Sequence, residues 1–433
     1  MRVSLMTLMA IALMASSVSA AELSAVVQKT TAEVYAQPSF DAPRLATLAR
    51  NAVVKIFAQQ GLWYQLQLPA GTPGFVRVDD IRINYAGAED GEANLHVLMG
   101  GKAGEGRVTE TAGVRGIDES DLQSAAFDQA QLDAMVRNRV NGAAATAYAR
   151  EQGWSATTVA YAGEARPDKS DVASAVKSAG GMLSALGGQV GSLFGMAAKA
   201  APKPEEELAA EELALGPAIA GRLLGARPLW KNPDAQLRVN RVGRWLASQT
   251  SRPELPWTFG VIDTPEVNAY AAPGGYILVA RGLYELLSSD SELAAVLGHE
   301  ISHCVQRDHY NVIRKQELAS TGKDLALSQV SAGTETVAGS YARRYVEQYG
   351  ATVMLTALDR EAEYDADEAA EYYLARAGMN PLALYAVLQK MTALGSKSAS
   401  LAQLFKTHPP LDARMDRIDR RGYGPLESYT KRG

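Results

Sequence analysis

Cysteine, positive charge and long apolar runs are all scarce in this sequence. Its only cysteine is Cys304, so no intrachain disulfide can form. Lysine and arginine total 43 against 48 aspartates and glutamates, and no basic run stands out. This balance excludes the electrostatic footprint of a nucleic-acid-binding protein. After the first twenty residues no apolar run is long enough to cross a bilayer, so we expect no transmembrane segment.

The first twenty residues have the pattern of a secretory signal peptide. Arg2 precedes a short apolar run, Leu5 to Met14, and small residues at Val18 and Ala20 follow it. No cysteine lies near the cleavage site, which excludes a lipid anchor there. We therefore expect cleavage near Ala20 and export to a bacterial periplasm.

Residues 21–85 contain short runs of alternating apolar and polar residues, separated by proline, glycine, aspartate and asparagine. Such runs predict a small β-barrel. The stretch GLWYQLQLPAGTPGFVRVDDI, residues 61–81, resembles the bacterial Src-homology-3-like module. Its aromatics Trp63, Tyr64 and Phe75 could line a groove for cell wall or an envelope protein, or they could form the core of the barrel.

The middle of the chain is less informative. Residues 86–160 are expected to be mixed or helical, with helical periodicity from about Ser120 to Gln152, and have no assigned role. Residues 161–205 are rich in glycine, alanine and serine, which favours a linker over a segment that touches a membrane or covers a cleft. Residues 206–421 predict a mainly helical domain with a short β-sheet, followed by a tail, 422–433.

The chain has five histidines, and two lie four residues apart in the stretch LGHEISHCVQRDH, residues 297–309. Ser289 and Glu292 fit a capping box, so a helix should begin near Asp290. On that helix His299 and His303 lie on one side, at the border of a broad apolar surface. Two buried imidazoles one turn apart need a partner, and a metal ion can bind both.

Such a site needs a third protein ligand. On a continuous helix His309 and Cys304 both point away from His303, and Cys304 is better explained as a small buried hydrophobe. The acidic segment Asp359 to Pro381 offers Glu363 as a ligand. Asp367, one turn later, would accept a hydrogen bond from the outer N–H of a ligating imidazole.

These stretches resemble the gluzincin family of CAAX-prenyl-protease-like and HtpX-like peptidases. AAVLGHEISH and EAEYDADEAA match its H-E-x-x-H and E-x-x-A-D patterns, VNAYAAPGGYILVARGL its edge strand and hairpin, and THPPLDARMDRI its His-Pro-x-x-x-x-Arg segment. The resemblance covers about residues 210–421. Unlike the membrane-embedded members, this chain has no apolar span after its leader, so it resembles the exported branch.

The resemblance implies an α+β multidomain protein whose second domain is a zincin-type metallopeptidase acting on polypeptides in envelope quality control. One zinc ion would be held by His299, His303 and Glu363, with Glu300 as general base. The substrate would pair with the strand of Asn268, Ala269 and Tyr270. Because no motif residue lies in residues 21–85, we expect their deletion to leave cleavage of short peptides intact.

Two other functions remain open at this point: a cell-wall-binding adaptor with an inert peptidase domain, and a zinc amidase acting on peptidoglycan. His408 also has alternatives. It could cap a turn, donate a hydrogen bond to the oxyanion of the reaction, or bind zinc in a resting state and act as a brake. We expect the oxyanion role, in which case replacing His408 lowers turnover.

Overall fold

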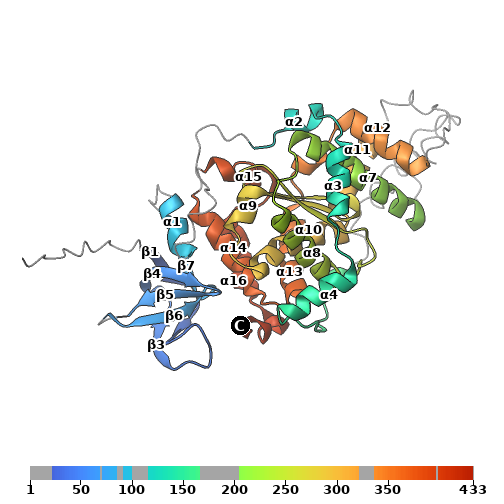
Figure 1. Cartoon of the computed structure of the whole chain (residues 1–433). Helices are drawn as coiled ribbons and strands as arrows, with labels where there is room; N and C mark the ends of the chain where they lie inside the picture. The colour runs from blue at the N-terminus through green and yellow to red at the C-terminus, as the bar shows by residue number, and fades with distance from the viewer. Residues whose placement is uncertain are drawn as a thin grey trace, which may run out of the picture.

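The computed structural model describes residues 22–68, 71–84, 91–99, 116–165, 204–320, 336–395 and 398–432. The predicted leader and most of the predicted linker lie outside these ranges. A small β-domain lies against one side of a larger helical body, and the C-terminus comes close to both (Figure 1).

The β-domain is an antiparallel sheet in the order β3-β2-β6-β5-β4-β1-β7, rolled into the predicted barrel. Alternate residues of its strands point inward, as the sequence pattern predicts. Tyr64 is fully buried in the core of the barrel, which supports the core interpretation for this residue. Trp63 and Phe75 are mostly buried but lie on the other face of the sheet, outside that core, where Trp63 packs on Tyr35 and Phe40. The strands are β1 (Leu23–Val27), β2 (Thr31–Tyr35), β3 (Arg44–Ala49), β4 (Val53–Gln60), β5 (Trp63–Gln67), β6 (Pro73–Arg77) and β7 (Ile81–Ile83).

The region between the two domains contributes short helices: α1 (Gly91–Leu98) packs on the barrel strand β4 and on α14 (Leu382–Ala393), and the others pack on the body. The predicted periodicity over 120–152 corresponds to three separate helices, because Asp118, Asp128 and Asn141 each cap a new helix. Leu132 and Met135 are buried against the body. The helices are α1 (Gly91–Leu98), α2 (Glu119–Ser124), α3 (Gln129–Arg137) and α4 (Gly142–Glu151).

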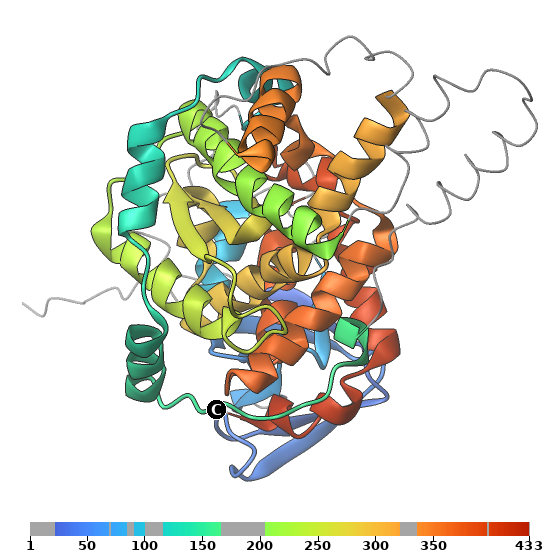
Figure 2. The same ribbon diagram turned by 90° about the vertical axis from the view of Figure 1, so that its right-hand side faces the viewer.

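A three-stranded sheet lies at the centre of the body, in the order β8-β10-β9 (Figure 2). β10 (Tyr276–Ala280) runs parallel to β8 (Thr258–Ile262) and antiparallel to β9 (Ala269–Ala272). Helix α7 (Glu205–Ala226) packs on one face of the sheet, and α8 (Pro233–Ala247) and α10 (Asp290–Val305) pack on the other.

The remaining helices follow in chain order. They are α9 (Arg281–Leu286), α11 (Asp308–Ser320), α12 (Val337–Tyr349), α13 (Arg360–Arg376), α14 (Leu382–Ala393), α15 (Leu404–Thr407) and α16 (Leu411–Arg421). Helices α11, α13 and α14 pack on α10, whereas α12 packs on α7. Together with the sheet and the barrel the helices confirm the predicted α+β class.

Helix α10 begins where the capping residues predicted. The Ser289 hydroxyl accepts from the Glu292 backbone N–H at 3.2 Å, and Glu292 reaches back to the Ser288 N–H at 2.7 Å. Gly298 lies on the small-residue side of the helix, where a Cβ would meet Ala370 of α13 at 3.2 Å. The lack of side chains there lets α13 approach closely, which brings its acidic residues to the two histidines.

The last residues are packed rather than extended into solvent. Tyr423 and Leu426 are buried, and Asn380 donates to the backbone carbonyls of Thr430 and Arg432 at 2.9 and 2.7 Å. Residues 422–432 therefore belong to the body. Among the described residues, none of the helices combines the length and apolar character that a membrane span requires.

Candidate metal centre

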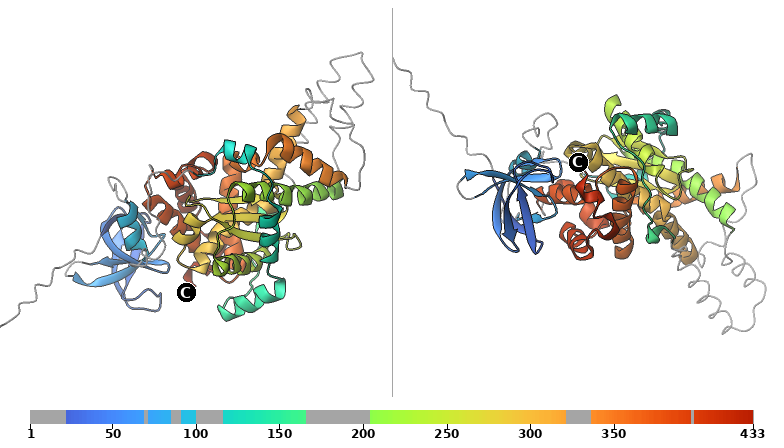
Figure 3. Two further views of the ribbon diagram at one scale, coloured as in Figure 1. Left: turned by 45° about the horizontal axis from the view of Figure 1, so that its top comes forward. Right: turned by 90° about the horizontal axis from the view of Figure 1, so that it is seen from below.

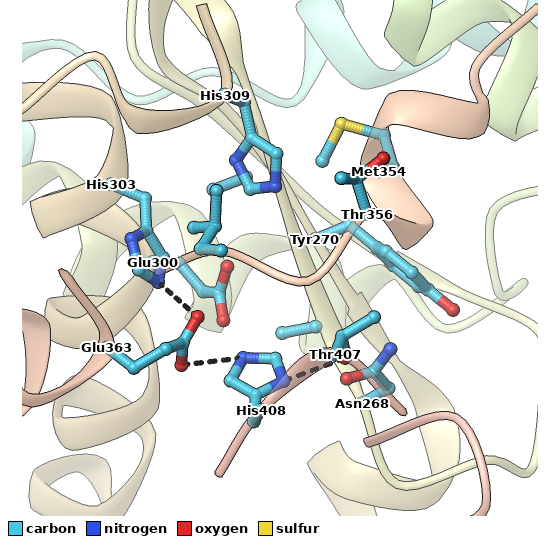
Figure 4. Close-up of a pocket in the computed structure, with 13 residues that line it drawn as sticks. Asn268, Tyr270, Glu300, His303, His309, Met354, Thr356, Glu363, Thr407 and His408 are labelled. Atoms are coloured by element: carbon cyan, nitrogen blue, oxygen red, sulfur yellow. Dashed lines mark hydrogen bonds and ion pairs between the residues drawn. The ribbon is translucent and has the colours of Figure 1, made fainter. Parts of the chain in front are cut away.

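Four side chains from three parts of the chain meet in a buried cluster. Their potential ligand atoms all lie within 4.8 Å of one another. His299 and His303 come from α10, where a spacing of four residues places both rings on one side. Glu363 comes from the first turn of α13, and His408 directly precedes Pro409 and Pro410 in the chain (Figure 4).

Both α10 imidazoles are held by carboxylates. Nδ1 of His299 lies 3.0 Å from Oδ1 of Asp367, and Nδ1 of His303 lies 2.8 Å from Oδ2 of Asp308. Asp367 is itself fixed by Arg414, whose Nε donates to its other oxygen at 2.9 Å. Because an ionised carboxylate only accepts, each Nδ1 carries the proton and each Nε2 keeps a lone pair.

Those two lone pairs face each other. The Nε2 atoms lie 3.2 Å apart, and Oε2 of Glu363 lies 3.5 Å from Nε2 of His299 without a hydrogen-bond partner in the described part of the chain. A tetrahedral ion about 2.0 Å from each nitrogen would hold them about 3.3 Å apart. Facing acceptors and an unpartnered buried carboxylate oxygen fit a bound cation, so the residues present suit a metal ion.

The electrostatics of the cluster agree with this conclusion. Burial and the Arg414 charge lower the pKa of His299, but Asp367 and Glu363 outweigh them and raise it to about 9. Burial raises the pKa of Glu363, yet His408 and the two α10 histidines bring it well below its ordinary value. Without a metal, a proton would therefore be attracted to the place that a cation would occupy.

Glu300 follows His299 and points into the same space without being one of the four clustered residues (Figure 4). Glu300 is buried, and this burial raises the pKa of its carboxyl. The Glu363 charge also raises it, whereas His299 and His303 lower it by less than burial and Glu363 together raise it. A carboxylate with a raised pKa accepts a proton more readily at neutral pH, which suits general-base catalysis.

Strand β9 forms a wall of the pocket that contains Glu300, His303, Glu363 and His408. It pairs with β10 on one side, and the other side is an edge of the sheet. The Asn268 carbonyl accepts from the Ala280 N–H at 3.0 Å, so by alternation Ala269 and Ala271 present their backbone groups at the free edge. The Tyr270 side chain lies on the face of the sheet that packs on α7, opposite to the side chains of Ala269 and Ala271, and its hydroxyl donates to Glu266 at 2.6 Å.

The pocket is small. Its cavity volume is about 20 Å³, which is space for about one water molecule. Met354, Thr356 and Leu358 line it on the side away from α10.

His309 occupies a place that the sequence did not predict. The assumption of one continuous helix is wrong, because α10 ends at Val305, Arg307 has a φ of 58°, and α11 begins at Asp308. The break turns Asp308 back to His303 and places the His309 ring centroid 5.9 Å from that of His303. His309 lines the pocket but lies outside the four-residue cluster.

His408 lies against the ligands and not at a distance across the pocket. Its Nε2 is 3.6 Å from Oε2 of Glu363, and its Nδ1 is 2.8 Å from the Thr407 hydroxyl. Burial lowers the pKa of its imidazole to about 3, so the ring is neutral and can offer a lone pair. This position favours the resting-ligand alternative over the oxyanion role that the sequence led us to expect.

Cys304 takes no part in the site. It is buried on α10, and its thiol contacts the Ala272 carbonyl at 3.4 Å. Burial, reinforced by the Glu212 charge, raises the pKa of this thiol, which keeps it protonated. The interpretation of Cys304 as a small buried hydrophobe is confirmed.

Comparison with known proteins matches the domain that carries this cluster. Residues 233–422 match the description "Peptidase family M48", and residues 30–82 match "Bacterial SH3 domain". Residues 233–422 are a peptidase family M48 domain. The M48 domain contains all four clustered residues and Glu300, and the SH3 domain corresponds to the barrel.

The M48 domain also has named relatives. The chain is 26% identical over 213 residues to the beta-barrel assembly-enhancing protease of Escherichia coli, an alignment that covers 47% of this chain and 42% of that protein. It is 25% identical over 195 residues to the mitochondrial metalloendopeptidase OMA1 of Schizosaccharomyces pombe, covering 45% and 55%. The chain thus spans about half the length of these relatives.

Two residues of the M48 domain that fix the histidines had no role from the sequence. Asp308 would point away from His303 on an unbroken helix. Arg414 lies in a recognised segment, but only the fold reveals that it reaches Asp367. The helix break has no strong local signal, because Arg307 is neither glycine nor proline.

Proposed function

We propose that the chain is an exported zinc metalloendopeptidase of the bacterial envelope that cleaves unfolded or damaged envelope proteins. The observation that carries the proposal is the buried cluster of His299, His303, Glu363 and His408 beside Glu300 and a free strand edge. The M48 match supports peptidase chemistry, and the pattern of residues 1–20 supports export.

His299, His303 and Glu363 would hold the ion. Imidazole nitrogens with a carboxylate oxygen form a ligand set typical of catalytic zinc. When bound, zinc supplies a Lewis acid and lowers the pKa of water. Asp367 and Asp308 keep both Nε2 lone pairs directed at the ion by holding the protons on Nδ1. Glu300 takes the proton of the attacking water and returns it to the leaving amine.

The free edge of β9 suits an extended polypeptide. Ala269 and Ala271 offer backbone N–H and C=O groups, and a substrate strand that pairs with them is read through its main chain. Asn268 contributes a buried side-chain oxygen that has no partner in the described residues. Recognition of this kind requires an unfolded segment and little sequence preference. The Escherichia coli relative is named a beta-barrel assembly-enhancing protease, which supports a protease that acts during the assembly of envelope proteins.

The test combines metal analysis with cleavage of an unfolded protein such as casein. The mature chain should contain one zinc and cleave, and Glu300→Gln should keep zinc while losing roughly 10²–10⁴ in rate. Glu254→Gln, an exposed carboxylate of the same domain outside the cluster, is the control and should behave as wild type. Wild-type rates in Glu300→Gln would refute the mechanism. Peptidoglycan binding by a zinc-free chain that cleaves nothing would instead support an adaptor.

A further inference from the structure

The barrel is attached to the M48 domain by buried polar contacts. The side chain of Gln389, on α14, is fully buried and makes three hydrogen bonds to the barrel backbone. Its Nε2 donates to the carbonyls of Val78 and Ile81 at 2.7 and 3.2 Å, and its Oε1 accepts from the Ile83 N–H at 2.9 Å. The apolar core of the barrel continues into the core around α14.

A second set of contacts joins the barrel to α16. Arg82 on β7 pairs with Asp416 at 2.5 Å and with Asp419 at 2.6 Å. These aspartates are three residues apart, so they share one side of α16. The Tyr385 hydroxyl of α14 lies 3.2 Å from Asp419, which links the two helices at the same place. The views in Figure 3 show the barrel lying beside these C-terminal helices.

The opposite side of α16 faces the metal centre. Arg414 is two residues before Asp416, which places the two side chains about 200° apart around the helix. Arg414 is buried and donates to Asp367, and Asp367 contacts Nδ1 of His299. One short helix therefore connects Arg82 of the barrel to a candidate metal ligand. His408 lies just before the same helix, separated from it by Pro409 and Pro410.

Other polar contacts join α16 to α13: Arg417 pairs with the exposed Glu361 at 3.2 Å, and Arg421 acts at the end of the helix. Arg421 pairs with Glu371 of α13, whereas Asp416 and Asp419 tie the middle of the helix to the barrel. If the barrel undocked, Gln389 and Arg82 would exchange these contacts for water. The apolar core that the barrel shares with α14 would also be exposed, which favours the docked arrangement.

We propose that the docked barrel is a positioning element for the metal centre, in which Arg82 and Gln389 hold α14 and α16 so that Arg414 keeps Asp367 on His299. This inference rests on the metallopeptidase function proposed above. It gives the barrel a partner within its own chain, and it contradicts the sequence-based expectation that residues 21–85 can be deleted without effect on the site.

Zinc affinity measured by competition with a chelating dye tests the proposal without relying on catalysis. Arg82→Ala should weaken zinc binding about tenfold, the low end of the effect of losing an outer partner of a ligand. Arg82→Lys keeps one ion pair and should give an intermediate affinity if the alanine variant folds poorly. Arg44→Ala is the matched control, since Arg44 pairs with Glu33 within the barrel and should leave the affinity unchanged.

A double-mutant cycle separates positioning from general destabilisation. If Arg82 acts through Arg414, Arg82→Ala should have little further effect on zinc affinity in an Arg414→Ala background. Equal affinities of the wild type and Arg82→Ala, or fully additive effects in the cycle, would overturn this proposal alone. A wild-type chain that binds no zinc would overturn the proposed function and this proposal with it.

Discussion

Two buried charge networks in this protein differ in how their charges balance. At the metal centre the buried carboxylates of Glu300, Glu363 and Asp367, with the Asp308 carboxylate on His303, face one guanidinium, Arg414, so negative charge is in excess unless the histidines are protonated or a cation is bound. In the barrel, Arg77 and Lys29 face Asp79 and Asp80, so the charges cancel. The first network lacks the charge of a divalent cation, and the second needs no ion. Buried charge therefore indicates a ligand only where it is left unpaired.

The strongest way to break the metal network is to remove Glu363. Glu363→Ala should lose zinc, because it removes a ligand and one of the negative charges around the site. Asp367→Asn keeps the shape beside Arg414 and should only weaken zinc affinity, by roughly 10–100-fold. Chelator competition measures both. Full zinc occupancy in both variants at equal affinity would place the third ligand elsewhere.

Replacing His408 should change peptide turnover by a smaller factor, and the direction of that change distinguishes its two proposed roles. If its ring occupies the metal site about four-fifths of the time, His408→Ala should raise peptide turnover about fivefold. Zinc should be retained, since His299, His303 and Glu363 remain. Steady-state cleavage of a short peptide, with metal content checked, provides the measurement. Lower turnover with zinc retained would restore the oxyanion role.

The smallest effect is expected from the balanced barrel network. Burial, together with the Asp79 charge, raises the pKa of Asp80 to about 6 from its ordinary 3.8. The folded state thus holds this proton more tightly than the unfolded state, so stability falls as pH rises from about 4 to about 6. The Asp80→Asn variant does not lose stability in this way. At pH 7.5 its free energy of unfolding should exceed that of the wild type by on the order of 1 kcal/mol, which is roughly 2–4 °C in Tm.

Thermal melts of both proteins across that pH range test the sign. The advantage of Asp80→Asn should grow between pH 4 and pH 6 and stay constant above it. A constant difference at every pH would show that Asp80 does not titrate in this range. Metal affinity should not follow this change, because Asp80 contacts neither Arg82 nor α16 in the described structure.

Much of the metal centre could be predicted because its pairs are local. His299 with His303 and Glu363 with Asp367 are each four residues apart, and a regular helix fixes the direction of both members. The capping residues Ser289 and Glu292 also act within one turn of α10. His309 was misplaced for the converse reason: the break at Arg307 has no local signal.

The sequence by itself determined the barrel, the helical domain and the candidate metal ligands, since short-range periodicity and helical spacing encode them. Only the tertiary structure decided that Asp308 and Arg414 fix the imidazoles, that His408 lies against Glu363, and that the barrel contacts α14 and α16. The contacts of Gln389 with the barrel join residues about three hundred positions apart. Contacts over such separations arise from the packing of whole domains, which no local pattern specifies.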